Sequence, residues 1–445
     1  MQKHYQDRYL CYDLQALAER VARTLAQNED DYQLYKWLIS SRTFIPAGNT
    51  LLAGATDIAP NCCVLGRLDE ENFPEMLELS KKLWSQRTGI GFDLSGMQDP
   101  VAALRLLSDA NAAINLGHRP NRGNMATLEA THPCIREFVS CKDSGSTISN
   151  FNISVSVAGD ALDESLLRCI AEQAWKTGDP GLIFLDRLQN YGPVSAVGLP
   201  PIVTVVPCGE QGMHRFETCN LGSINLNSPE LLCSGSTYAI DIGKLRGVVH
   251  AAVQLMDSVV DRLVYPDERI REVSLAARRI GLGVMGWADY LKKADIPYDS
   301  DDAILTAGTF SQLITRFAQE KSRELAKKLG PCAYSTEYRN ISLTCIAPTG
   351  GITGLTENSG YAIEPFFSDA TTVSPIAHIR MQSAWQFGLH NAVSKTVNLP
   401  HTTTVEDIIS IYKEAMVPKR GLKGITVYRD QSKLMQPISL CPACQ

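Results

Sequence analysis

Short runs of β-branched residues alternate with amphipathic helical segments along most of this chain, and no other feature constrains the fold as strongly. The runs expected to form strands are 152–157, 181–185, 202–206 and 424–427, and the segments expected to form helices are 73–85, 162–176, 244–263 and 305–329. Such alternation is typical of βα units that build a largely parallel sheet. The sequence therefore predicts an α/β fold from residue 44 to about residue 430.

The two ends of the chain follow different patterns. Residues 8–43 carry apolar side chains at helical spacing, so residues 1–43 are expected to form a small N-terminal helical segment. Residues 431–445 are expected to form a short mobile tail. A length of 445 residues suggests two or three domains of about 150 residues each, and a single large α/β barrel with appendages is equally compatible with it.

Composition indicates an ordinary soluble protein, with 44% hydrophobic and 20% charged residues. The net charge of −6 is spread without long runs of like charge, so we expect no clustered basic face for DNA or RNA. The chain begins without an apolar signal sequence, and no apolar stretch approaches the ~20 residues of a membrane span. Thirteen cysteines, an odd number, fit a cytoplasmic protein with reduced thiols, some of them available for redox cycling.

Cys208 closes a β-branched run, in the segment Pro207-Cys208-Gly209-Glu210. A turn there would present the thiol at a loop tip. In extended backbone, residues two apart face the same side, so Cys208 and Glu210 are expected to address one bound molecule. Together with Cys219, they suit chemistry that needs a sulfur radical or nucleophile, an acid–base group and a reductant. The alternative is that Cys208 is a small buried hydrophobic residue.

Four other cysteines occur in pairs. A disulfide between the neighbours Cys62 and Cys63 would be strained, so one of them is expected to pair with a distant cysteine, Cys219 first of all; two buried core thiols are the alternative. Cys441 and Cys444 form a CxxC near the C-terminus, which favours a dithiol that exchanges with a buried disulfide. Half a zinc site is the alternative, but the chain has no second CxxC and no HxxxH.

Two segments are rich in glycine. Gly281–Gly286 matches GxGxxG, but it follows a helical basic segment, so close backbone packing is favoured over dinucleotide binding. Residues 347–354 follow an apolar run, and their backbone N–H groups could cradle a phosphate; a tight turn without a ligand is equally compatible. No HExxH, GxSxG or Walker sequence is present, so the common hydrolase and nucleotide-triphosphatase functions lack support.

Ten segments occur in one order along the chain: Asn61–Leu65, Arg87–Phe92, Asn150–Val155, Asp179–Phe184, Pro207–Glu210, Cys219–Leu226, Arg278–Gly286, Ile346–Gly350, Ile363–Phe367 and Gly424–Asp430. Together they resemble the catalytic chain of ribonucleotide reductases, in the class II branch that depends on adenosylcobalamin. The resemblance implies a ten-stranded α/β barrel over residues 44–430, with a radical cysteine on a finger loop inside it. It also implies that residues 431–445 are a redox tail.

By this resemblance, Cys208 would carry the thiyl radical that takes the 3′ hydrogen of a ribonucleotide. Glu210 would be the base for the 3′ hydroxyl and would help the 2′ hydroxyl to leave as water. Cys62 and Cys219 would supply two electrons and form a disulfide. Substrate contacts would come from Asn61, Gly91, Val206, Ala347, Pro348, Thr349, Gly350 and Gly351.

The resemblance also implies partners and a cofactor. Cys441 and Cys444 would reduce the disulfide, with electrons from a thioredoxin-like protein or a small dithiol. Adenosylcobalamin is the expected radical source, because the chain has neither the Tyr-Tyr pair of the branch with a second radical subunit nor a glycyl-radical signature. DxHxxG is absent as well, so no histidine need serve as the lower cobalt ligand. A monomer or homodimer that binds a ribonucleotide and no membrane is expected.

Three positions depart from the family. Val206 stands where the family usually has Asn, and losing its bonds to the sugar hydroxyls would cost ~1–3 kcal/mol. Met97-Gln98-Asp99 leads directly to Pro100 where relatives carry a glycine-rich loop for the specificity effector, so we expect weak or absent allosteric control. Gly351 replaces a hydroxyl residue in the phosphate loop, which makes a monophosphate or a specialised-pathway nucleotide a second candidate substrate.

Reduction of a ribonucleotide to its 2′-deoxy form is therefore the leading hypothesis. A redox-neutral radical rearrangement or epimerisation of a nucleotide on the same scaffold is the second, and Val206 motivates it. A catalytically silent regulator that binds a nucleotide or cobalamin is the third. The CxxC at the C-terminus argues against the third, because a binding module needs no delivered dithiol.

Overall fold

The computed structural model describes residues 8–114, 123–143, 146–159, 162–193, 199–235 and 238–432. It begins with two helices, α2 (Leu14–Leu25) and α3 (Glu29–Ser40). The side chains of Asp13 and Asn28 accept hydrogen bonds from the first turns of these helices, which fixes where each one starts. Both helices bury an apolar face in a core that they share with the barrel described below.

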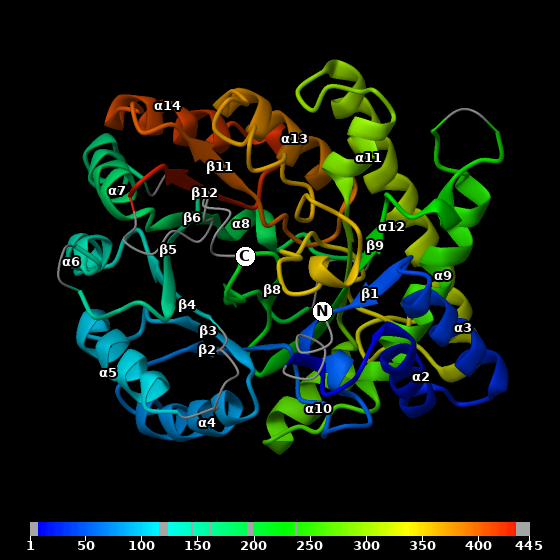
Figure 1. The fold of residues 1–445 in the computed structure, drawn as a ribbon. Coiled ribbons are helices and arrows are strands. Elements are labelled where there is room, and N and C mark those ends of the chain that lie inside the picture. The colour runs from blue at the N-terminus through cyan, green and yellow to red at the C-terminus, as the bar shows by residue number, and fades with distance from the viewer. Residues whose placement is uncertain are drawn as a thin grey trace.

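Five parallel strands form the first half of that barrel (Figure 1). They are β2 (Cys62–Arg67), β3 (Gly89–Asp93), β4 (Asn124–Glu129), β5 (Phe151–Val157) and β6 (Gly181–Phe184). The helices on their outer side are α4 (Phe73–Ser85), α5 (Pro100–Ala112), α6 (Ile135–Ser140) and α7 (Glu164–Thr177), and α8 (Leu185–Leu188) follows β6. Apolar side chains from strands and helices pack into one core between the two layers.

The second half repeats this arrangement. Its strands are β9 (Glu217–Asn225), β10 (Ile280–Met285), β11 (Thr396–Leu399) and β12 (Gly424–Arg429). Single parallel bridges from Leu282 to Thr344 and from Ile346 to Val393 insert residues 344–346 between β10 and the chain that leads into β11. The surrounding helices are α9 (Ile242–Val260), α10 (Glu268–Ala277), α11 (Trp287–Lys293), α12 (Asp301–Leu329), α13 (Pro375–Gly388) and α14 (Val405–Met416).

Two antiparallel joints connect the halves, β2 against β9 and β6 against β12. Residues 344–346 lie between β10 and β11, but single bridges alone hold them, so the strand ladder of the described residues is not continuous there. The two halves together are arranged as a ring (Figure 1), and the predicted ten-stranded α/β barrel fold is confirmed. β1 (Phe44–Pro46) pairs with β9 outside the ring. The short 3-10 helices are η1 (Gly48–Leu52), η2 (Pro229–Leu231), η3 (Thr353–Leu355) and η4 (Pro418–Arg420).

A small hairpin lies in the middle of the ring (Figure 1). Its strands, β7 (Thr204–Val205) and β8 (Gly212–Met213), pair with each other in antiparallel fashion. The strand predicted over 202–206 is therefore shorter than expected. The Thr204 hydroxyl bonds the Thr127 hydroxyl of β4 at 2.8 Å, so the hairpin is held against the inner side of the first half.

The GxGxxG segment lies in β10, which is buried along its whole length, except for Gly286, which precedes α11. A Cβ on Gly281 would lie 2.8 Å from the sulfur of Cys345, and one on Gly283 would lie 2.6 Å from the Cys345 carbonyl oxygen. Close backbone packing, the predicted use of these glycines, is confirmed. Among the described residues, no helix has both the length and the apolar character needed to span a bilayer.

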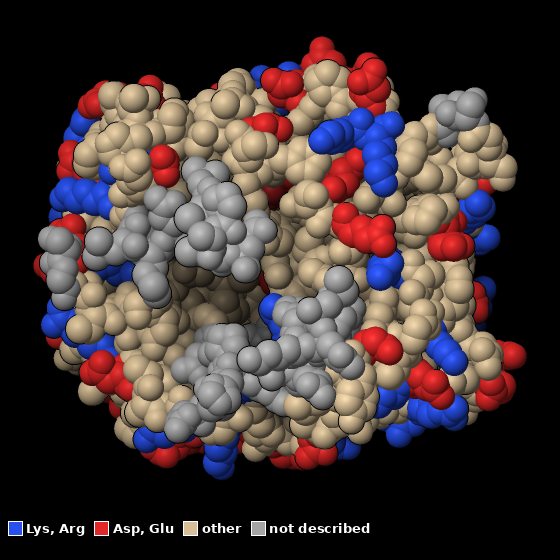
Figure 2. Space-filling view, viewed as in Figure 1, with Lys and Arg blue, Asp and Glu red and all other residues tan. Residues whose placement is uncertain are grey.

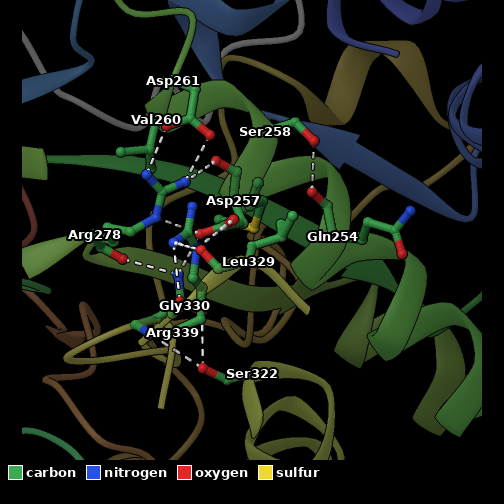
Figure 3. A network of polar contacts seen from close by, with 12 residues as sticks. Gln254, Asp257, Ser258, Val260, Asp261, Arg278, Ser322, Leu329, Gly330 and Arg339 are labelled. Carbon is green, nitrogen blue, oxygen red and sulfur yellow. Dashed lines mark hydrogen bonds and ion pairs between the residues drawn. The ribbon is translucent and has the colours of Figure 1, made fainter. Parts of the chain in front are cut away.

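A buried polar network fixes the start of β10 (Figure 3). Arg278 ends α10 in the left-handed conformation, at φ 49°. Its guanidinium donates to Asp257 of α9 at 3.0 Å and to Asp261 at 2.6 Å, and Arg339 donates to the other oxygen of Asp257 at 3.3 Å. Buried charges are tolerated only when they are paired in this way. The network therefore ties α9, α10 and the chain after α12 to one end of β10.

Candidate active site

The turn of the inner hairpin carries the two residues that the sequence singled out. The Gly209 amide donates to the Val206 carbonyl at 2.9 Å, and Gly209 has a φ of 77°, which favours glycine. The predicted turn with the thiol at its tip is therefore confirmed, whereas the expectation that Cys208 and Glu210 face the same side, as in extended backbone, is wrong. Cys208 is exposed at the tip, whereas Glu210 is only 2% exposed. The thiol and the carboxyl group are thus close in the chain but lie in different environments.

Both halves of the barrel hold this turn. Asn152 of β5 donates to the Pro207 carbonyl at 2.9 Å. From the second half, the Ala392 amide donates to the Glu210 carbonyl at 3.0 Å. Asn391 accepts a hydrogen bond from the Gly212 amide at 2.9 Å. The tip is therefore fixed from opposite sides, which suits a group that must be held accurately against a substrate.

Glu210 is a buried carboxyl group with an unsatisfied oxygen. Among the described residues, none donates a hydrogen bond to its Oε2. Burial raises the pKa of Glu210 to about 7, against an ordinary value of 4.5, because a charged carboxylate is poorly solvated there. A pKa near neutrality suits a general acid or base. Glu210 itself is not among the described residues that line the cavity beside the hairpin tip.

Cys62 of β2 and Cys219 of β9 are directly opposite each other in the antiparallel joint between the two halves. Directly opposed residues in an antiparallel pair have Cα atoms about 4.5–5.5 Å apart, which lies within the range of disulfides. Cys63, the next residue, faces the other side and packs in the outer core between strands and helices. The structure therefore selects Cys62, rather than Cys63, as the partner of Cys219.

The thiols of Cys62 and Cys219 belong to a small apolar cluster inside the ring, which also contains Val206 and Cys345. A hydrogen bond with Cys62 lowers the pKa of Cys219, whereas burial and the nearby Glu210 raise it, and the net pKa lies above the ordinary thiol value. Burial likewise raises the pKa of Cys345. These thiols are therefore protonated at neutral pH, the form that can give up hydrogen together with an electron.

A cavity of about 550 Å³ opens beside the hairpin tip. Figure 2 shows that the molecule is hollowed at the middle of the ring on the face viewed in Figure 1. The hairpin supplies Cys208 to the wall of this cavity, and the glycine-rich loop supplies Pro348 and Gly350. The cavity thus brings the exposed thiol and the predicted phosphate loop to one space of a size that suits a small ligand.

The glycine-rich loop is folded on its own side chains. Thr349 is buried, its hydroxyl accepts a hydrogen bond from the Ala362 amide at 2.7 Å, and it bonds the Thr353 hydroxyl at 3.0 Å. Gly350 and Gly351 are exposed, and a Cβ on Gly350 would meet open space. Thr349 therefore shapes the loop, while the bare backbone at Gly350 and Gly351 stays accessible to a ligand.

Several predicted substrate contacts do not line the cavity. Asn61, Val206 and Ala347 are buried and are not among its described lining residues. Gly91 is buried as well, and a Cβ there would overlap the Val205 carbonyl oxygen, so this glycine lets the hairpin approach β3. The side-chain nitrogen of Asn61 has no hydrogen-bond partner among the described residues. The predicted redox pair Cys441 and Cys444 lies outside the described residues.

Other residues of the cavity wall were missed by reasoning from single residues. Glu364 lines it and pairs with the buried Lys395 at 2.5 Å, and the Tyr428 hydroxyl is buried without a partner among the described residues. Tyr361 and Phe367 add two aromatic rings, with centroids 5.0 Å apart. The signal was present, because Glu364, Phe367 and Tyr428 occur in segments 363–367 and 424–430 that carry the family resemblance.

Two larger cavities do not carry this chemistry. One of about 1060 Å³ is bordered by Arg187, His390 and Lys423, and one of about 1090 Å³ by Asp289 and Lys292. None of the described residues that line these two cavities is a cysteine. Size alone would favour these cavities, but the thiol, the glycine-rich loop and the nearby raised-pKa carboxyl group favour the smaller one.

Comparison with known proteins identifies the family of this chain. A family model described as ribonucleotide reductase, barrel domain, matches residues 160–337 and 361–428. The vitamin B12-dependent ribonucleoside-diphosphate reductase of Thermoplasma acidophilum is 30% identical over 91% of this chain, which spans 66% of that relative. The protein of the same name from Mycobacterium tuberculosis is 31% identical, covering 97% of this chain and 79% of the relative.

A solved structure has the same fold. The alpha subunit of the class Id ribonucleotide reductase of Actinobacillus ureae superposes with a TM-score of 0.83, over 97% of this chain and 96% of that one. Its sequence is 17% identical, so this likeness bears on the fold alone. The family model and the two relatives show that the chain belongs to the ribonucleotide reductases.

Proposed function

We propose that this protein reduces a ribonucleotide to the 2′-deoxyribonucleotide by a thiyl-radical mechanism, with adenosylcobalamin as its cofactor. One observation carries the proposal: an exposed thiol, Cys208, lines a cavity inside the barrel, two residues from the buried carboxyl group of Glu210. The facing thiols Cys62 and Cys219 supply the reductant that this reaction needs. The names of the relatives from Thermoplasma acidophilum and Mycobacterium tuberculosis support the cofactor.

The residues present fit the cofactor. Cys208 is exposed to the cavity, whereas Cys219 is buried, so only the former is open to a radical that arrives from outside. The rings of Tyr361 and Phe367 line the same space and would hold a planar adenosyl group. No histidine is among the described cavity-lining residues, so none of these residues offers an imidazole ligand to cobalt. When bound, the cofactor would supply the radical equivalent that oxidises a thiol.

The chain's own residues would do the rest. Cys208 takes the 3′ hydrogen of the ribose and later returns it. Glu210 accepts the proton of the 3′ hydroxyl at its unpaired Oε2, and the 2′ hydroxyl leaves as water. Cys62 and Cys219 each give one electron and one proton, and they end as a disulfide. Two electrons lost by sulfur thus balance the two gained by the substrate.

The redox cycle would be completed by the C-terminal CxxC. Cys441 and Cys444 exchange with the Cys62–Cys219 disulfide and are reduced in turn by a thioredoxin-like protein or a small dithiol. Replacing both tail cysteines by serine should abolish turnover with thioredoxin and leave one turnover per chain. A small dithiol that reaches the barrel directly should restore part of the activity.

We further propose little or no control by a specificity effector. β3 ends at Asp93 and α5 starts at Pro100, and the connection is folded tightly. The Met97 amide donates to the Leu94 carbonyl at 3.0 Å, and a Cβ on Gly96 would meet the Leu68 carbonyl. This short connection leaves little backbone to wrap around an effector. Deoxynucleoside triphosphates should therefore leave the substrate preference unchanged.

Incubation with adenosylcobalamin, a dithiol and each ribonucleoside mono-, di- and triphosphate, followed by chromatography, tests the proposal. A deoxynucleotide is expected from at least one phosphorylation state. If none gives a deoxy product, the proposal is wrong. Cys208→Ser should remove the product completely, because a hydroxyl group cannot carry the radical in place of the thiol.

A redox-neutral radical rearrangement or epimerisation is the second candidate. Val206 favours it, because this apolar side chain is buried in the inner cluster and offers no hydrogen bond to a sugar hydroxyl. Such a reaction consumes no electrons. Activity that survives both Cys62→Ser and Cys441→Ser would therefore support the rearrangement. No product in Cys62→Ser and a single turnover in Cys441→Ser would support reduction.

A further inference from the structure

The geometry points to Arg8 as a residue that binds the phosphate of the substrate at the glycine-rich loop. The inference rests on the proposed function, since it presumes that a nucleotide occupies the cavity beside Cys208. It goes further by assigning a cation from the N-terminal segment, far away in the sequence, to a loop that carries no charged side chain of its own. Residues 347–354 read Ala-Pro-Thr-Gly-Gly-Ile-Thr-Gly.

The guanidinium of Arg8 lies against the bare face of Gly351. A Cβ on Gly351 would be 3.0 Å from Nη2 of Arg8. Gly350, the neighbouring residue, lines the cavity and meets open space at its own Cβ position. A phosphate that approaches the backbone of Gly350 and Gly351 therefore comes within reach of the guanidinium. The absence of side chains at both glycines makes room for the anion and the cation together.

The segment that carries Arg8 is held accurately. The hydroxyl of Tyr9, a buried residue, donates to the Gly351 carbonyl at 2.6 Å and so fixes the segment to the loop itself. Arg20 of α2 donates to the carbonyls of Tyr9, Leu10 and Leu51, each at 2.8 Å. Arg20 thus joins the segment to η1. Preorganisation of this kind lowers the entropic cost of binding.

Charge in the cavity calls for such a cation. Among the described residues that line it, none is a lysine or an arginine, whereas Asp179 and Glu364 are both acidic. These two carboxylates already have cation partners, Lys142 at 2.9 Å and Lys395 at 2.5 Å. A nucleotide phosphate carries negative charge that the cavity wall does not offset. Arg8 is exposed and forms no ion pair with another described residue, so its charge remains available.

Arginine suits this role for geometric reasons. Its planar fork can give two parallel hydrogen bonds to one phosphate, while the backbone amides of the loop bond other oxygens. The contact is remote from the ribose carbons that react. Arg8 should therefore act on substrate binding and leave the chemical step nearly unchanged.

The test compares Arg8→Gln with the wild type by steady-state kinetics and by calorimetric titration with ribonucleotides in the absence of cobalamin. We expect KM and Kd for the nucleotide to rise about 10- to 100-fold, with kcat changed less than about twofold. Arg8→Lys should lie between the two proteins, because it keeps the charge and loses the fork. Inorganic pyrophosphate should compete with the nucleotide in the wild type and much less in Arg8→Gln.

Arg262→Gln is the matched control, since Arg262 is also exposed and forms no ion pair with another described residue. It removes the same charge and should leave KM and Kd unchanged. An equal rise of KM and Kd in Arg8→Gln and Arg262→Gln would show that the effect comes from the change in net charge, and would overturn the inference. Unchanged KM and Kd in Arg8→Gln would overturn it as well.

A double variant sharpens the test. Gly351→Ser alone should weaken binding, because its side chain would crowd the Arg8 guanidinium. Combined with Arg8→Gln, the serine gains space and offers its own hydroxyl donor, so part of the lost affinity should return. Additive losses in the double variant would show that the two positions do not share a ligand, and would contradict the inference.

The two proposals fail in different ways. If the wild type binds nucleotides and Arg8→Gln does not, but no deoxy product forms, the inference stands and the proposed reaction is wrong. If product forms with equal KM in both, the reaction stands and the inference is wrong. If the wild type binds no ribonucleotide at all, both are wrong.

Discussion

Cys62 and Cys219 face each other across the antiparallel joint between the two half-barrels, although they lie 157 positions apart in the chain. Residues that oppose each other in this way can form a disulfide without backbone movement. Cys63, one position further along β2, points into the outer core instead. A disulfide between Cys62 and Cys219 would therefore lie in the joint between the two half-barrels.

The first prediction concerns this pair. A single turnover without external dithiol should leave a Cys62–Cys219 disulfide, which peptide mapping by mass spectrometry would detect. Cys62→Ser should abolish deoxynucleotide formation. Cys63→Ser is the matched control and should retain at least about half of the activity, because Cys63 faces away from the cavity and serine replaces it at nearly the same volume.

Cys345 offers the outcome that would contradict this assignment. Its thiol lies in the same inner cluster as Cys219. The contradicting result would be a disulfide that forms on turnover between Cys345 and either Cys62 or Cys219, without any Cys62–Cys219 disulfide. The register of β2 and β9 would then not define the redox pair.

The second prediction concerns the pH dependence of activity. Burial raises the pKa of Glu210 to about 7, and the proposed base must be ionised. The kcat/KM should therefore fall about tenfold per pH unit below that value and level off above it. Glu210→Gln should lower kcat by about 10²- to 10⁴-fold and remove this limb of the profile. A wild-type profile that stays flat down to about pH 5 would show that Glu210 is not the base.

The third prediction concerns the free energy of unfolding. Ionisation of Glu210 should lower it, whereas the same ionisation should raise the activity. The folded-state pKa of Glu210 lies above its unfolded value, so between pH 4.5 and about 7 the folded state binds more protons at this site. Its contribution to the free energy of unfolding therefore falls as the pH rises through this window and stays low above it. Glu210→Gln should match the wild type in stability near pH 5 and exceed it near pH 8, by no more than about 3 kcal/mol.

Urea unfolding of both proteins at the two pH values would measure this difference. If the free energies of unfolding of the two proteins differ by the same amount at both pH values, ionisation of Glu210 does not destabilise the folded protein. Burial would then not raise the pKa of this carboxyl group.

The fourth prediction concerns the fit of the hairpin against β3. Gly91→Ala would place a methyl group where the Val205 carbonyl oxygen lies, so the hairpin must move and carry Cys208 with it. We expect kcat to fall at least about 10²-fold, the size expected when a reacting group is displaced by about 1 Å. Gly247→Ala in α9 is the control, because its Cβ would meet open space. It should keep full activity and gain about 0.5–1 kcal/mol of stability.

A crystal structure of the Gly91→Ala protein should show the hairpin displaced from its position in the wild type, together with the loss of activity. Full activity in that variant would mean that the close approach of β7 to β3 is not needed to place Cys208.

Local patterns in the sequence were sufficient for much of the fold. The helix at 73–85 has the predicted bounds because its apolar spacing and its ends are encoded within the segment itself. The alternation of strands and helices predicted an α/β fold, and the ordered motifs implied the ten-stranded barrel. Local reasoning predicted the turn and the exposed thiol of Cys208, but it placed Glu210 on the same side as that thiol. Glu210 is buried instead, and its carbonyl accepts a hydrogen bond from the amide of Ala392, which lies 182 positions further along the chain.

The sequence by itself determined which chemical groups are available: an exposed-loop cysteine with a nearby carboxyl group, further thiols, and a glycine-rich loop without charge. The tertiary structure decided which of them meet. Strand register selected Cys62 over Cys63, burial set the pKa of Glu210, and chain packing brought Arg8 to Gly351. The physical reason is that helix and strand periodicity arise from neighbours in the chain, whereas register, burial and charge proximity depend on segments hundreds of residues apart.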